Sequence, residues 1–196
     1  DLCLGLYAQA LDDSGFGYDI WSWWRGTPPN NILDLYTDGV VVWFCSHTFP
    51  VLTKAERDAI DYYLSQGGNL LITEQDIGWA LVEDGTAESA AWYRNTLLAE
   101  YLEDDSGLKT VAGVAQDPLS NGLEFSIDLG SGAANQYFPS LIDPISPAQT
   151  CFIYSDYTGP YTGTAGIRYS RNNSKVVYLA FGFEGISSQT QRSQVM

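Results

Sequence analysis

Carboxylate side chains follow two apolar, strand-like runs of this chain. Glu74, Gln75 and Asp76 follow Leu70–Ile72 after one residue, Thr73, and Glu184 ends the run that reads KVVYLAFGFE. If both runs are core strands that end at the same sheet edge, the three carboxylates lie close together. When carboxylates lie close together, the pKa of one of them rises or the group binds a cation such as calcium. Three interpretations stay open: an Asp76–Glu184 acid/base pair, a calcium site that also includes Glu74, and a structural network in which Gln75 and Asp76 cap the following turn.

A second candidate couple is Cys45 and His47, which end the run GVVVWFCSH. A thiol with an imidazole base is a nucleophile for acyl transfer. Residues i and i+2 on a strand lie about 7 Å apart, which is too far for direct proton transfer. The couple therefore requires that the chain leave the strand at Ser46. The alternative is a buried Cys45 that ends a strand and a surface His47 on a loop.

Three tryptophans, Trp21, Trp23 and Trp24, lie in the β-prone stretch YDIWSWW. On a strand, Trp21 and Trp23 face one side and Trp24 the other. One interpretation is packing in the core or against a neighbouring domain. The other is contact with a peptide or a sugar ring. Together with Gln75, these tryptophans are the candidate binding residues.

The composition limits the classes of function. The 196 residues are 45% hydrophobic and 17% charged, which suits one globular domain. The net charge of -15 repels phosphate backbones and argues against nucleic-acid binding. No apolar run reaches the roughly 20 residues that span a bilayer. An acidic surface with few lysines is common on extracellular proteins, and the alternative is an acidic surface that only keeps the protein soluble.

The pattern of elements alternates first and then becomes rich in strands. Residues 2–11 have helical spacing, and the alternative is a strand in which Leu2, Leu4 and Leu6 alternate. Thr53 with Glu56 forms a capping box that opens a second helix. A third helix is expected over 87–104. After residue 107, short β-prone runs alternate with turn residues, and AGIRYS-RNNS-KVVYLAF predicts a hairpin. The expected fold is a three-layer α/β sandwich with a mainly parallel sheet and an antiparallel edge. Residues 1–196 are expected to form one such domain, as a piece of a longer polypeptide.

The order of the segments GYDIW, VVVWF, GGNLLITEQDIG, GAANQ and VVYLAFGFE resembles class I glutamine amidotransferase-like (flavodoxin-like) domains. Such domains occur as accessory modules of large secreted bacterial and archaeal proteins, so the resemblance implies a secreted or cell-surface protein. The resemblance covers nearly the whole chain. Active members carry a cysteine nucleophile in a G-x-C-x-G elbow and His and Glu in a late F-H-P-E-like segment. The resemblance places Asp76 at the nucleophile's position, Gly182 at the histidine's position and Glu184 at the acid's position.

This set of residues lacks the parts of the amidotransferase mechanism. Thiol-type acyl transfer needs a thiolate, a base and an orienting group, and Gly182 cannot move a proton. We therefore expect a non-catalytic accessory or interaction domain. Its partners would be neighbouring domains of the same polypeptide, another protein or copies of itself. The alternatives are a hydrolase that uses Asp76 with Glu184 or Cys45 with His47, and a self-assembling structural subunit. No cofactor is expected, apart from the calcium that a carboxylate cluster could bind.

Overall fold

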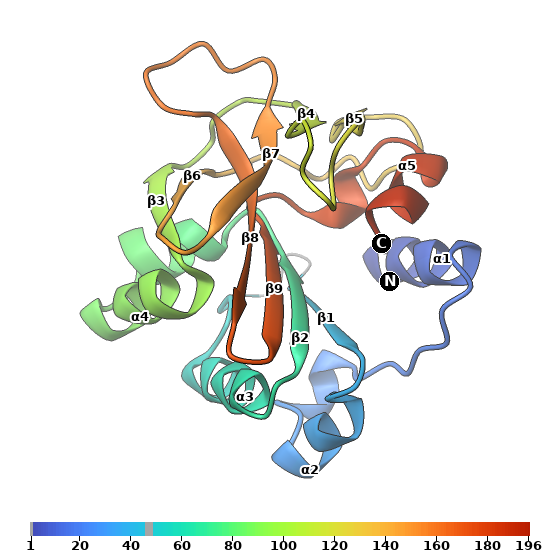
Figure 1. The fold of residues 1–196 in the computed structure, drawn as a ribbon, viewed down its shortest axis with the longest axis vertical. Helices are drawn as coiled ribbons and strands as arrows, with labels where there is room; N and C mark the ends of the chain where they lie inside the picture. Colours follow the sequence, from blue (N-terminus) through green and yellow to red (C-terminus); the bar gives the residue numbers. More distant parts are fainter. Residues whose placement is uncertain (1, 46–48) are drawn as a thin grey trace.

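The computed structural model describes residues 2–45 and 49–196 (Figure 1). In these ranges the chain forms a nine-stranded sheet with helices on both faces. The strands are β1 (Val40–Phe44), β2 (Asn69–Thr73), β3 (Ala99–Glu103), β4 (Thr110–Gly113), β5 (Glu124–Ser126), β6 (Leu141–Pro144), β7 (Gln149–Tyr154), β8 (Thr164–Arg171) and β9 (Ser174–Leu179). The α-helices are α1 (Leu2–Asp13), α2 (Asn30–Leu33), α3 (Lys54–Ser65), α4 (Ala87–Trp92) and α5 (Gln189–Val195). Short helical turns lie at Trp23–Arg25, Asp34–Tyr36, Trp79–Glu83, Tyr93–Leu97 and Phe183–Gly185. No described helix is long and apolar enough to span a membrane.

The sheet is mixed and curls into a half-barrel, so the expected mainly parallel three-layer sandwich is wrong. Among the described strands, only β1 with β2 and β2 with β9 pair in parallel. All other described pairings, which include β8 with β9, β7 with β8 and β3 with β6, are antiparallel. Parallel neighbours need a long crossover, usually a helix, and the chain after residue 107 joins its strands by turns and loops without one. The strands of the second half of the chain therefore pair antiparallel with one another, and β9 also pairs in parallel with β2.

Two apolar clusters, one on each face of the sheet, form most of the core. Along β2, Leu70 and Ile72 belong to one cluster, and Leu71 packs against the other. This alternation is the period of two that a strand imposes on its side chains. Helices α3 and α4 cover the first face, and α1 with α5 cover the second (Figure 1). Ser14 Oγ donates to the carbonyl of Ser193 at 3.1 Å and ties α1 to α5.

Three local predictions are confirmed. Residues 2–11 are helical, within α1. The capping box is present before α3, because Thr53 Oγ1 accepts from the amide of Glu56 while the Glu56 carboxylate accepts from the amide of Thr53. The predicted hairpin is formed by β8 and β9, with Asn172 in the left-handed conformation (φ 56°) at its turn. All three patterns depend on residues close together in sequence.

The helix expected over 87–104 is too long. Residues 87–97 are helical, Leu98 adopts a positive φ of 55°, and the chain then enters β3. Strand β3 pairs with β6, where Tyr101 lies opposite Ile142. The helix-forming residues of this segment are overridden by pairing with a strand about 40 residues later in the chain.

The strand expected over Tyr18–Trp24 is absent, and only a single helical turn forms at Trp23–Arg25. No described strand is paired with this segment. The Arg25 guanidinium lies 5.3 Å from the ring centroid of Trp21 and 5.1 Å from that of Trp24. The expected division of the tryptophans between two faces of a strand is therefore wrong, because β propensity without a pairing partner does not form a strand.

Strand β1 lies at an edge of the sheet, although a continuous apolar run such as VVVWF is typical of a buried parallel strand. Among the described strands it pairs with β2 alone. Val40 is 59% exposed, and the other four residues of β1 are half-buried. An exposed apolar edge strand offers unpaired backbone groups to another strand.

Candidate functional site

The ends of β2 and β9 are joined by Thr73. The hydroxyl of Thr73 donates to the carbonyl of Phe181 at 2.7 Å and accepts from the amide of Phe183 at 2.8 Å. Because parallel strands end at the same edge of a sheet, this contact places the segment after β2 beside the segment after β9. Glu74, Gln75, Asp76 and Glu184 are all buried in these two segments.

The carboxylate of Glu184 accepts hydrogen bonds from three side chains. Tyr7 Oη donates to Oε2 at 2.9 Å, Asn135 Nδ2 donates to Oε1 at 2.8 Å, and Gln136 Nε2 approaches Oε1 at 3.5 Å. Glu184 is 1% exposed, so these bonds replace the water that the carboxylate would otherwise bind. A buried carboxylate with this number of donors is stabilised by the chain itself.

Gln75 holds the loop that covers this region. Its Nε2 donates to the carbonyl of Asn135 at 3.2 Å, and its Oε1 accepts from the amide of Phe138 at 2.8 Å. Its own carbonyl accepts from Ser140 Oγ at 2.6 Å. Gln75 is 1% exposed. The candidate binding amide is thus engaged within the chain.

Gly182 lies at the position that the resemblance assigns to a histidine, and the packing around it explains the residue. Its amide donates to Gln136 Oε1 at 2.6 Å. A Cβ at this position would lie 2.5 Å from both Gln136 Nε2 and Glu184 Oε1. A side chain here would therefore disrupt the bonds that hold Glu184.

Burial and negative charge suppress ionisation of the neutral acids around this region. Burial raises the pKa of Tyr7 well above its usual value, and the adjacent Glu184 raises it further. Burial likewise raises the pKa of the Cys45 thiol well above its usual value, with Glu74 as the next cause. The thiol of Cys45 is therefore protonated at neutral pH, which opposes its use as a nucleophile. His47 lies outside the described residues, so the Cys45–His47 couple has no described geometry.

The remaining carboxylates of the cluster are also enclosed. Glu74 is 2% exposed, and its Oε1 accepts from the amide of Gln75 at 2.9 Å. Asp76 is buried, and its carbonyl accepts from the amide of Ala80 at 2.9 Å. Within residues 2–45 and 49–196, no group of three His, Cys, Asp or Glu side chains is arranged to hold a metal ion. We call the buried set Tyr7, Glu74, Gln75, Asn135, Gln136 and Glu184 the carboxylate cluster.

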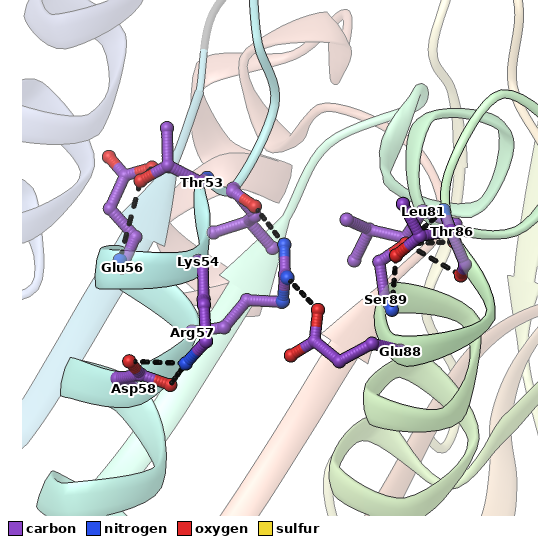
Figure 2. A network of polar contacts seen from close by, with 10 residues as sticks. Thr53, Lys54, Glu56, Arg57, Asp58, Leu81, Thr86, Glu88 and Ser89 are labelled. Carbon is purple, nitrogen blue, oxygen red and sulfur yellow. Dashed lines mark hydrogen bonds and ion pairs between the residues drawn. The ribbon is translucent and has the colours of Figure 1, made fainter.

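A different feature, absent from the sequence predictions, is a hollow of about 340 Å³ between the start of α3 and the start of α4. Its apolar wall is formed by Pro50, Val51, Leu52, Ala80 and Leu81, and its polar wall by Thr53, Lys54, Arg57, Thr86, Glu88 and Ser89, with Gly85 completing the lining. Figure 2 shows Arg57 and Glu88 reaching toward each other from the two helices. We call it the α3–α4 hollow.

Arg57 is the buried charge of the α3–α4 hollow. Its Nη1 donates to the carbonyl of Leu52 at 2.8 Å, and its Nη2 donates to Glu88 Oε2 at 2.7 Å (Figure 2). Arg57 is 7% exposed, whereas the side chain of Glu88 is 57% exposed. One sequence signal could have found it: Arg57 lies three residues before Ile60 on the face of α3 that packs into the core.

Trp21 and Trp24 do not line the α3–α4 hollow, and their described contacts are with Arg25 and Gly26. Trp24 is 67% exposed, Trp21 is half-buried, and Trp21 Nε1 donates to the carbonyl of Gly26 at 2.8 Å. The side chain of Trp23 is outside the described set. The loop therefore presents at least one exposed indole, stacked on Arg25.

No family model matches the chain, and no curated protein matches it in sequence. Solved structures are similar to it in fold. A β-galactosidase from Rahnella sp. R3 superposes with a TM-score of 0.63 at 15% identity, over 98% of this chain and 26% of that one. A cytoplasmic protein from Salmonella typhimurium gives 0.61 at 12% identity, over 97% and 82%. The exo-β-1,4-mannosidase Op5Man5 from Opitutaceae bacterium strain TAV5 gives 0.60 at 14% identity, over 99% and 30%.

These likenesses show the fold alone, and this chain spans about a quarter of the length of the Rahnella enzyme. They also correct the expected resemblance to class I glutamine amidotransferase-like, flavodoxin-like domains. The sheet is a curled mixed half-barrel, and the matched structures are a β-galactosidase, a mannosidase and a cytoplasmic protein. The resemblance inferred from the order of segments along the chain is therefore wrong.

Proposed function

We propose that this chain is a non-catalytic accessory or interaction domain that works beside other domains of a longer polypeptide. The observation that supports this most is the closed carboxylate cluster. Glu184 has its carboxylate enclosed by Tyr7, Asn135 and Gln136, and Gln75 fastens the loop above it. A general acid or base must reach a substrate within hydrogen-bonding distance. Glu184 is 1% exposed and has no such access.

The same region lacks an activated nucleophile among its described residues. The Cys45 thiol has a raised pKa because of burial and the charge of Glu74. Gly182 supplies no proton-transfer group. The remaining polar atoms hold the ends of β2 and β9 and the loop over 135–140 together. These bonds give the cluster a structural role.

The solved neighbours suggest the setting of such a domain. In the β-galactosidase and the mannosidase, the matched part is about a quarter to a third of a longer chain. The fold thus occurs as one component of larger proteins. We propose that the partners of this chain are neighbouring domains or another protein, and that the exposed indole of Trp24 contributes to such a contact. Self-association through the exposed edge of β1 is the alternative.

A location outside the cell stays a prediction, and the net charge of -15 is compatible with it. The acidic surface keeps the domain soluble and repels other polyanions.

An activity screen tests the proposal. The chain and a Glu184→Gln variant are incubated with a nitrophenyl ester, nitrophenyl β-galactoside and a γ-glutamyl anilide, and product release is followed by absorbance. We expect no turnover above buffer for either protein. Turnover by the parent chain that Glu184→Gln abolishes would overturn the non-catalytic assignment. Light scattering on a dilution series of the same sample distinguishes a monomer from the self-associating alternative.

A further inference from the structure

The α3–α4 hollow combines an apolar wall with one buried cation. Its volume of about 340 Å³ is at the lower end of the range for small-molecule sites. Val51, Leu52 and Leu81 form the apolar wall, and all three side chains are buried. Such a surface accepts a small aliphatic group. The chemical character of the ligand is then decided by the polar group beside this wall, which is Arg57.

Only some of the N–H donors of the Arg57 guanidinium have described hydrogen-bond partners. Nε and Nη2 lie on the same edge of the planar group, and carboxylates commonly bind both at once. Glu88 contacts Nη2 with one oxygen at 2.7 Å. Among the residues that the structure describes, Nε of Arg57 has no hydrogen-bond partner, although it is buried. A buried donor without a partner is uncommon in folded proteins and calls for an explanation.

Glu88 is a weakly held partner for this cation. Its side chain is 57% exposed, and it lies in the first turn of α4, from which it can rotate into water. The Arg57 side chain is 8% exposed and is fixed by the carbonyl of Leu52. Figure 2 shows Glu88 approaching Arg57 across the space between the two helices. A second carboxylate can therefore replace that of Glu88 while Arg57 stays in place.

We propose that the α3–α4 hollow is a binding site for a carboxylate carried on a short aliphatic body. The ligand carboxylate takes the place of Glu88 on Arg57 and bonds both Nε and Nη2. The aliphatic body lies against Val51, Leu52 and Leu81. The carboxylate comes either from a free branched-chain acid or from the C-terminus of a polypeptide with an aliphatic last residue. This site is independent of the non-catalytic role proposed above.

The net charge of the chain gives this site a recognisable salt dependence. At a net charge of -15, the long-range field repels a carboxylate. Salt screens that field over about 10 Å at 0.1 M, whereas the contact with buried Arg57 is screened much less. We expect affinity for the acid to stay constant or rise between 20 and 300 mM NaCl. An anion held only by exposed lysines would bind more weakly as salt increases.

The experiment follows the Arg57 Nε–H resonance by ¹H–¹⁵N NMR during titration with 3-methylbutanoate, with neutral 3-methylbutanamide as the matched control ligand. Arg57→Lys, which lacks Nε, assigns the resonance. We expect the acid, and not the amide, to shift this resonance. Arg57→Lys should weaken binding roughly tenfold or more because the two-point contact is lost. Glu88→Gln should tighten binding about threefold or more because the internal competitor loses its charge. Glu124→Gln, an exposed change on β5, should bind as the parent does.

Two peptides separate the sources of the carboxylate. Acetyl-Ala-Val with a free C-terminus is compared with its C-terminal amide. Binding of the acid peptide at least as tight as that of 3-methylbutanoate identifies a chain terminus as the ligand, and binding of the small acid alone identifies a free acid. The proposal is overturned if neither acid shifts the Arg57 resonance in the parent or in Glu88→Gln. It is also overturned if the amides bind equally well. Glu88→Gln keeps the test decisive if Arg57→Lys does not fold.

Discussion

The carboxylate cluster and the α3–α4 hollow each contain a buried charge, and the two charges differ in their hydrogen-bond partners. Glu184 accepts from Tyr7, Asn135 and Gln136, all of them buried. Arg57 donates to one carbonyl and to one half-exposed carboxylate, and its Nε is left without a described partner. Burial alone therefore does not indicate function.

The two regions differ in how completely the chain supplies hydrogen-bond partners to the buried charge. At the end of β9 the partners come from α1 and from the loop over 135–136, so the charge holds distant parts of the chain together. In the α3–α4 hollow, Nε of Arg57 is a donor without a described partner beside an opening of about 340 Å³. A charge that the fold already satisfies stabilises the fold, whereas a partly satisfied charge beside an opening can bind a ligand.

The largest expected effect comes from removing the satisfied charge. Glu184→Ala leaves the hydroxyl of Tyr7 and the amide of Asn135 buried without their acceptor. We expect the free energy of unfolding to fall by about 3–5 kcal/mol, as for other broken buried polar networks. Glu184→Gln keeps an acceptor and should cost about 1–3 kcal/mol. Urea unfolding followed by fluorescence measures both. Glu124→Ala, at an exposed position of β5, is the control and should change stability by less than about 0.5 kcal/mol. If Glu184→Ala is as mild as this control, the cluster does not hold the fold.

A smaller loss is expected from the α3–α4 hollow. Arg57→Leu keeps apolar volume, removes the donor to the carbonyl of Leu52 and releases Glu88 to solvent. Because the released carboxylate is already half-exposed, the cost should be about 1–2 kcal/mol in the same urea experiment. A loss as large as that of Glu184→Ala would show that Arg57 is a structural charge of the same kind, and would remove the contrast between the regions.

The smallest expected change in stability comes from replacing Asp143. Among the described residues, the buried Oδ1 of Asp143 has no hydrogen-bond partner. Burial raises the pKa of Asp143, and Glu100, opposite it in the β3–β6 pair, raises it further. The folded state thus disfavours the charged form of Asp143. At pH values above its folded pKa, the ionised carboxylate therefore lowers the free energy of unfolding. The cost disappears as the pH falls below its unfolded pKa.

Asp143→Asn should therefore raise the free energy of unfolding at pH 7 by a few tenths of a kcal/mol, a value reduced by solvent screening at this partly exposed site. The gain should vanish near pH 3, where the aspartate is protonated in both states. Thermal unfolding at the two pH values measures it. A destabilising Asn at pH 7 would mean that the charge of Asp143 has a favourable partner, as that of Glu184 has.

The sequence by itself determined the features that depend on neighbouring residues. The capping box of Thr53 and Glu56 starts α3, helical spacing forms α1, and the polar turn at Asn172 closes the β8–β9 hairpin. The sequence also predicted that the segments after β2 and β9 meet, since two apolar runs that end in polar residues end at one edge when they pair in parallel.

Tertiary structure alone decided the rest. Strand direction depends on which strands pair, and residues 99–103 became β3 because β6 was available. The tryptophan segment near residue 21 did not become a strand because no described strand pairs with it. The ion pair between Arg57 and Glu88 exists only because packing places α4 beside α3. Local backbone preferences are encoded residue by residue, whereas partners, burial and openings arise only when distant segments pack together.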